Sequence, residues 1–148
     1  MQTMNFEKIK EMAEKDLAID DTELGNESTR IPQLHNKYLV IFHDERLVLR
    51  KAQADYRTLR KDKWEYYTGK MSQERLTELG WQPFQSKILR NDLDVYMDSD
   101  KDLSSLQVKI EYQQEKVDYL ESVLKGISQR HWVIRNSIEW RKFTNGIV

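Results

Sequence analysis

The stretch KDLSSLQVKIEYQQEKVDYLESVLKGISQRHWVIRNSI, residues 101–138, has the most regular pattern in the 148-residue chain. Its apolar side chains recur at intervals of three and four residues in strict alternation, with Gln113 and His131 as polar interruptions. The apolar members are Leu103, Leu106, Ile110, Val117, Leu120, Leu124, Ile127, Ile134 and Ile138. This is a heptad pattern, and its length predicts one long helix that packs against another helix.

A second apolar line on the same helix bears on self-association. Val108, Tyr112, Tyr119 and Val123 make the apolar surface too wide for a simple two-stranded seam. A helix that is apolar on two sides is expected to pack against its own domain and against a second copy of the chain. An intramolecular bundle uses the same heptads, so the pattern alone leaves both arrangements open. The residues expected to form the contact between copies are Leu120, Leu124, Ile127, Ile134 and Ile138.

The rest of the chain predicts further helices and no strand. Apolar residues at helical spacing indicate helices over residues 4–17 and from about Pro32 to Tyr67, with a polar connection between them. Gly69 is expected to end the long helix, and a short helix is expected over residues 72–79, closed by Gly80. Residues 86–100 suggest a third helix, whose expected buried side chains are Ile88, Leu89, Val95 and Tyr96.

We therefore expect an all-α protein in which a long helix and a C-terminal heptad-patterned helix form an oligomerising helical bundle. We expect one continuous body with two roles. Residues 1–100 would form an N-terminal helical region with a binding role, and residues 101–148 a C-terminal helical oligomerisation region.

The net charge of −1 conceals blocks of opposite sign. Residues 30–63 hold nine basic and four acidic side chains, whereas residues 92–121 hold three basic and nine acidic ones. Such blocks are expected to meet, within one chain or between chains. The chain has no cysteine, which excludes disulfides and thiol chemistry, and no apolar run approaches a membrane span. These features predict a soluble, intracellular protein.

Basic side chains gather along one face of the helix expected over residues 32–67. Arg46, Arg50, Arg57 and Lys61 share this face, and Trp64 joins it at the C-terminal end. Most such rows are solvated surface. The alternative is a surface that binds phosphates while rings stack on the bases of a single strand. For Tyr66 and Tyr67, the sequence leaves stacking and burial in the core equally open.

We find no catalytic or metal-binding constellation in the sequence. His35 and His43 lie eight residues apart, which does not place two ligands on one helical face at the usual spacing. No phosphate-binding glycine loop and no nucleophile elbow occurs, and the acidic run at residues 91–102 lacks the order of an EF-hand loop. No enzyme, cofactor or metal is expected. The two remaining functions are nucleic-acid binding and a coiled-coil scaffold or adaptor that binds only proteins.

The segment Lys61-Asp62-Lys63-Trp64-Glu65-Tyr66-Tyr67-Thr68-Gly69 resembles the signature of the UvsY-like recombination mediators of T-even-type bacteriophages. The signature reads basic, any residue, basic, apolar, acidic, Tyr, Tyr, Ser or Thr, Gly. Two other stretches resemble other parts of the family in order and spacing. Asp16 to Asp20, followed by Thr22 and Leu24, resembles its N-terminal connection, and Asp100 to Leu103 opens a helix in the corresponding place. The resemblance covers most of the chain and is densest at residues 61–69.

The resemblance implies an all-α, non-enzymatic protein that assembles through its C-terminal region into a ring-like homo-oligomer, a hexamer or heptamer. Its implied partners are single-stranded DNA, the phage single-strand binding protein and a RecA-like phage recombinase. It would help to load the recombinase onto covered DNA in the cytoplasm of the infected bacterial host. The implied DNA-contacting pair falls on Lys61 and Lys63, so residues 1–100 would be the N-terminal helical DNA-binding region. We add five candidates from the basic face and its flanks, which are Arg50, Arg57, Arg60, Lys70 and Trp64.

Overall fold

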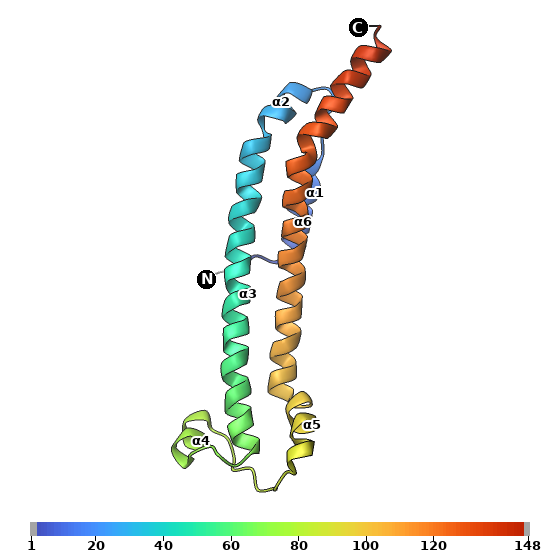
Figure 1. Ribbon diagram of the computed structural model, residues 1–148. Helices are drawn as coiled ribbons and strands as arrows, with labels where there is room; N and C mark the ends of the chain where they lie inside the picture. The colour runs from blue at the N-terminus through green and yellow to red at the C-terminus, as the bar shows by residue number, and fades with distance from the viewer. Residues whose placement is uncertain (1–2, 147–148) are drawn as a thin grey trace. The chain divides into compact units, whose positions relative to one another are not determined.

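The computed structural model describes residues 3–146 and confirms the all-α class, since no strand occurs between these residues. Two long helices, α3 and α6, make up more than half of the chain (Figure 1). In chain order the elements are α1 (Phe6–Leu17), α2 (Leu24–Thr29), α3 (Ile31–Tyr67), α4 (Gln73–Leu79), the 3₁₀ helix η1 (Arg90–Asp92), α5 (Leu93–Asp98) and α6 (Lys101–Thr144).

The chain divides into two compact units, and α3 and α6 each contribute to both. Unit 1 combines the chain up to Val48 with the chain from Gln113 onward, and unit 2 is Leu49–Tyr112. The expected division at residue 100 is one of roles and stays a prediction. The compact units follow other boundaries because both long helices pass through them.

The core of unit 1 is built from one face each of α1, α3 and α6. Ile9 and Ala13 of α1 and Leu34 and Tyr38 of α3 are buried against the heptad residues of α6. Those heptad residues and a neighbour are Leu120, Val123, Leu124 and Ile127. The heptads of unit 1 therefore pack within one subunit, which is the intramolecular arrangement that the sequence left open.

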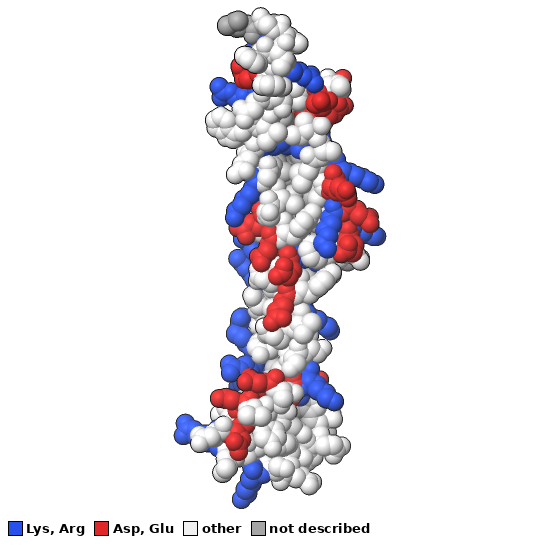
Figure 2. Space-filling model, turned by 90° about the vertical axis from the view of Figure 1, so that its right-hand side faces the viewer, with Lys and Arg blue, Asp and Glu red and all other residues white. Residues whose placement is uncertain are grey.

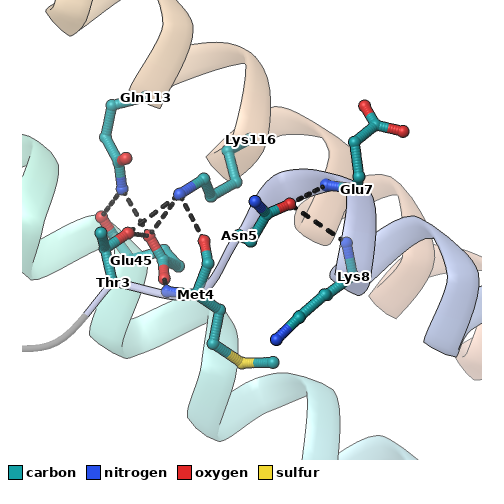
Figure 3. A network of polar contacts seen from close by, with 8 residues as sticks. All are labelled: Thr3, Met4, Asn5, Glu7, Lys8, Glu45, Gln113 and Lys116. Carbon is teal, nitrogen blue, oxygen red and sulfur yellow. Dashed lines mark hydrogen bonds and ion pairs between the residues drawn. The ribbon is translucent and has the colours of Figure 1, made fainter.

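A buried carboxylate fixes the start of the chain to both long helices (Figure 3). Glu45 accepts hydrogen bonds from Thr3 Oγ1 at 2.6 Å, from the Met4 N–H at 2.7 Å and from Gln113 Nε2 at 2.7 Å. Lys116 Nζ lies 3.3 Å from the same carboxylate and donates to the Met4 carbonyl at 2.7 Å. Burial raises the pKa of Glu45, but these hydrogen bonds and the ammonium outweigh burial, so the pKa is lowered.

A second buried ion pair closes the other end of unit 1. Arg130 donates to the carbonyls of Leu17 and Ala18 at 2.7 and 3.1 Å and to the carboxylate of Glu27. Arg30 also contacts Glu27, at 3.2 Å. Within unit 1, Glu27 precedes α3 and pairs near the C-terminal part of α6, whereas Glu45 pairs with Gln113. The two helices therefore run antiparallel there (Figure 1).

Local sequence signals set the boundaries of the short helix α4 in unit 2. Ser72 caps α4 by accepting from the Arg75 N–H at 3.2 Å, and Gly80 ends it with φ +71°. Gly69, with φ +74°, follows the end of α3. Both positions need a left-handed backbone, which glycine adopts without a steric penalty.

The third helix expected over residues 86–100 is wrong in extent and in its buried face. Only η1 and α5 are helical in this segment. Leu89 is 74% exposed and Val95 and Tyr96 are also exposed, while Met97 is buried. The apolar side chains of a six-residue helix give too short a pattern to identify its inward face.

Candidate nucleic-acid interface

A groove in unit 2, which we call the basic groove, lies between the C-terminal part of α3 and α5. It has a volume of about 480 Å³. From α3 it is lined by Arg57, Arg60, Lys61 and Trp64, whose spacing of three, four and seven residues places them on one helical face. The α5 side contributes Leu93, Asp94 and Met97. One wall is therefore cationic and aromatic, and the other is mainly apolar.

The cations of this groove have few partners of their own. Arg57 and Arg60 are exposed and form no ion pair with a carboxylate among residues 3–146. The side chain of Lys61 is 76% exposed, and its Nζ lies 3.9 Å from Glu65 one helical turn away. An exposed pair at this distance contributes little energy, so the ammonium remains available to an anion. Arg50, two turns before Arg57 on α3, is exposed as well.

Trp64 presents its ring beside these cations. The side chain is 39% exposed, and Lys70 Nζ lies 4.5 Å from the ring centroid. The contact is a cation–π interaction that keeps the ammonium at the indole. A half-exposed indole next to basic side chains is the arrangement in which a base can stack while its phosphates are neutralised.

Lys63 does not belong to this surface, and the expectation that it points outward is wrong. It is 7% exposed, and its Nζ lies 2.7 Å from Asp102 and 3.1 Å from Asp100. The ammonium also lies 4.4 Å from the centroid of Trp81. Burial lowers the pKa of Lys63, but the two carboxylates outweigh burial and raise it. The ammonium is charged, buried and already neutralised, so it has no face left for a phosphate.

The two signature tyrosines are part of the same internal network. Tyr67 donates to Asp100 Oδ2 at 2.6 Å, and Asp100 accepts from the Leu103 N–H at 3.0 Å in the first turn of α6. Burial raises the pKa of Asp100, but the hydrogen bonds and Lys63 outweigh burial and lower it. Tyr66 donates to the Gln82 carbonyl at 2.6 Å. Both rings pack among aromatic neighbours, which are Trp81, Phe84 and Tyr96. These contacts half-bury both tyrosines, so neither ring is enclosed in a core and neither stands free on the surface.

The blocks of opposite charge in the sequence predicted that these two segments would contact each other. Lys63 lies in the basic block 30–63, and Asp100 and Asp102 lie in the acidic block 92–121. The blocks meet within one chain, one of the two arrangements expected. What the blocks did not reveal was which lysine of the pair Lys61 and Lys63 turns inward.

Four of the five residues expected to join copies of the chain are buried inside the subunit. Leu120, Leu124, Ile127 and Ile134 are buried, and Ile138 is half-buried. They cannot form an exposed seam, so this assignment is corrected. Other apolar side chains near the C-terminal end of α6 face solvent, and the side of this end seen in Figure 2 is mainly uncharged. These exposed residues are Trp132, Val133, Trp140 and Phe143.

Between residues 3 and 146, no group of three His, Cys, Asp or Glu side chains is placed to hold a metal ion. No helix in that part of the chain is long and apolar enough to cross a membrane.

The fold and this site describe an all-α protein with a cationic, aromatic surface at the end of a long helix. Residues 12–147 match the family described as recombination, repair and ssDNA binding protein UvsY, and the chain belongs to this family. The resemblance expected from residues 61–69 is thereby confirmed.

Known relatives cover nearly the whole chain. The recombination protein uvsY of Enterobacteria phage T4 is 21% identical over 143 residues, which span 97% of this chain and 99% of that protein. A crystal structure of the bacteriophage T4 recombination mediator protein UvsY, lattice type II, matches with a TM-score of 0.83 at 20% identity. It covers 96% of this chain and 98% of its own. A lattice type IV structure matches with a TM-score of 0.82 at 21% identity, covering 95% and 99%. The structural likeness shows a shared fold.

Proposed function

We propose that the protein is a recombination mediator that binds single-stranded DNA through the basic groove. The observation that carries this proposal is the exposed face of α3, where Arg57, Arg60 and Lys61 stand beside Trp64 without strong carboxylate partners. Arg50 and Lys70 extend the cationic surface at either end of this face. Membership of a family described by recombination, repair and ssDNA binding supports the same function.

Single strands suit this surface better than duplexes. Lys and Arg side chains neutralise phosphates of either form and release their counterions. Only the single strand also offers exposed base faces to a ring such as Trp64.

We propose further that the protein forms a ring-like homo-oligomer through the C-terminal end of α6. Trp132, Trp140 and Phe143 are large apolar side chains left in solvent, and Phe143 is 75% exposed. Trp140 and Phe143 also lie together, with ring centroids 5.7 Å apart, and exposed apolar rings grouped in this way are typical of interfaces. A ring-like oligomer repeats one weak cationic groove in every subunit. This repetition multiplies the affinity for a long strand without a new contact.

In the proposed role the protein acts by binding and not by catalysis. It would engage a RecA-like recombinase and a single-strand binding protein of the phage, and help the recombinase onto covered DNA in the cytoplasm of the infected host. Membership of a family described by recombination, repair and ssDNA binding supports this proposal.

Titration of a fluorescent oligonucleotide at several salt concentrations tests the DNA-binding proposal. Wild-type protein should bind the single strand more tightly than the duplex, and Arg57→Ala with Lys61→Ala should weaken binding. Loss of two phosphate contacts should reduce the slope of log K against log salt by roughly 1.4 per bound subunit. The matched control is Lys8→Ala with Lys15→Ala, which removes the same charge from exposed positions of α1. Wild-type protein that binds no DNA would instead favour the scaffold that binds only proteins.

Sedimentation velocity tests the assembly proposal. Replacement of Trp140 and Phe143 by Ser should reduce the size of the assembly while leaving the helical content unchanged, because both rings lie outside the core. A control replaces two exposed apolar residues of α3, Val40 and Leu47, by Ser. Full-size assemblies of the Trp140 and Phe143 variant would contradict the role of this end of α6.

A further inference from the structure

A second groove lies beside the basic groove in unit 2. It has a volume of about 980 Å³ and is formed by the end of α3, the residues just after it, and the segment 84–90 with Leu93. Its charged lining residues are Lys70, Lys87 and Arg90, and no Asp or Glu is among the described residues that line it. A groove with three cations and no carboxylate in its lining has a clear preference for an anion.

The two grooves share a wall. Trp64 and Leu93 line both of them, so the indole stands at their common border. Lys70, which lines the second groove, holds its ammonium 4.5 Å from the centroid of that indole. A ligand bound in the basic groove therefore has a continuous route across Trp64 into the second groove.

The other surfaces of the second groove are aromatic and apolar. Tyr67 and Phe84 contact each other edge-to-face with centroids 5.1 Å apart, and both line the groove. Ile88 and the strongly exposed Leu89 lie farther along the segment 84–90. Half-buried rings and the exposed Leu89 beside cations match a ligand that carries both negative charge and flat apolar faces.

Lys87 and Arg90 have no other evident role in unit 2. Both are exposed, and neither forms an ion pair with a carboxylate among residues 3–146. They lie in the segment that was expected to be an ordinary helix with an inward apolar face. The segment instead turns Leu89 and its basic neighbours outward.

We propose that the second groove is a further subsite for the same single-stranded polynucleotide, in which Lys87 and Arg90 contact phosphates and the strand crosses Trp64 between the grooves. This inference rests on the proposed function of the basic groove and extends it to residues outside α3. A strand of phosphates and bases supplies both chemistries that the groove presents. An acidic peptide supplies charge without stacking faces and fits the apolar wall less well.

Oligonucleotide titration across salt concentrations tests the inference with the full chain. Lys87→Ala with Arg90→Ala should weaken single-strand binding and reduce the salt slope by roughly 1.4 per bound subunit, as two lost phosphate contacts require. Lys8→Ala with Lys15→Ala again serves as the control for net charge, and circular dichroism checks the helical content of each variant. A milder pair, Lys87→Gln with Arg90→Gln, keeps the test valid if the alanine variant folds poorly.

The outcomes separate this inference from the function on which it rests. If wild-type protein binds single strands and the Arg57 and Lys61 variant is weakened, but the Lys87 and Arg90 variant matches the control, the second groove is not part of the DNA path. If wild-type protein does not bind DNA, the proposed function itself fails. The remaining experiment measures competition between oligoglutamate and the oligonucleotide for the protein. Loss of oligoglutamate binding with unchanged DNA binding in the Lys87 and Arg90 variant would overturn the inference in favour of an acidic protein partner.

Discussion

Unit 1 keeps its inward-facing cations against carboxylates and carbonyls, whereas unit 2 leaves a row of cations in solvent. Lys116 and Arg130 of unit 1 are buried and hold Glu45 and Glu27. Arg57 and Arg60 of unit 2 are exposed, and neither forms an ion pair with a carboxylate among the described residues. The contrast is sharpest within unit 2, where Lys61 and Lys63 are two residues apart and face opposite ways. A basic residue in a sequence motif therefore identifies neither a ligand contact nor a structural one until its partners are known.

The largest expected effect follows from removing Lys116, one of the two buried cations of unit 1 named above. Lys116→Ala leaves Glu45 buried without its ion-pair partner, so we expect a loss of about 3–5 kcal/mol in the free energy of unfolding. Denaturant titration at neutral pH measures it. The double variant Lys116→Met with Glu45→Gln removes both charges and should recover much of the loss. A loss no larger than that of Lys125→Ala, an exposed residue on the same helix, would contradict the structural role.

Lys63→Ala should cause the next largest loss of stability. It also distinguishes the roles of the two lysines of the signature, Lys61 and Lys63. It leaves Asp100 buried, but Asp102 is largely exposed, so we expect about 3 kcal/mol of destabilisation, at the low end for a broken buried pair. Thermal unfolding measures this loss. Lys61→Ala is the matched comparison and should leave the unfolding temperature unchanged. Equal unfolding temperatures for the two variants would show that Lys63 has no structural role.

Lowering the pH should weaken the same networks by a smaller amount. The pKa values of Glu45 and Asp100 are lowered in the folded protein, so each carboxylate stabilises the fold fully above its unfolded pKa, near 4. That stabilisation is lost as the pH falls through the folded pKa. The free energy of unfolding should thus fall from about pH 5 downward. Asp100→Asn should flatten part of this dependence. An identical pH dependence in wild type and in that variant would contradict the contribution of Asp100.

The smallest effect on stability is expected on the exposed face of α3. Replacing Arg57, Arg60 and Lys61 by Ala should change the free energy of unfolding by no more than about 0.5 kcal/mol, because none of the three has a strong partner among the described residues. Denaturant titration of the triple variant checks this. A loss as large as that of Lys63→Ala would assign the face to the fold.

The regular parts of the fold were predictable because their signal is local. Residues close to one another in the sequence determine the long heptad series of α6 and the caps at Ser72 and Gly80. The buried charges were not predictable in this way. Glu45 finds its partners 41, 42 and 68 residues away, and Arg130 finds Glu27 103 residues away. Arg130 is buried while the neighbouring heptad position His131 is exposed, because the guanidinium has carbonyls and a carboxylate to bind there.

The candidate site was predictable in place but not in membership. The basic and aromatic end of α3 is visible in residues 57–64, and three cations and Trp64 do line one groove. The inward turn of Lys63 depends on Asp100 and Asp102, which reach it only after the chain folds back. The second groove was hidden for a similar reason, since Ile88 and Leu89 were expected to face a core, whereas both line this groove.

The most direct test of the account compares the DNA affinity of the triple variant Arg57→Ala, Arg60→Ala, Lys61→Ala with that of wild type across salt concentrations. Single-strand binding should be weaker, and the salt slope should fall by roughly 2 per bound subunit, as three lost phosphate contacts require. A slope equal to that of the wild type, in a variant with wild-type stability, would contradict the assignment of the α3 face to DNA.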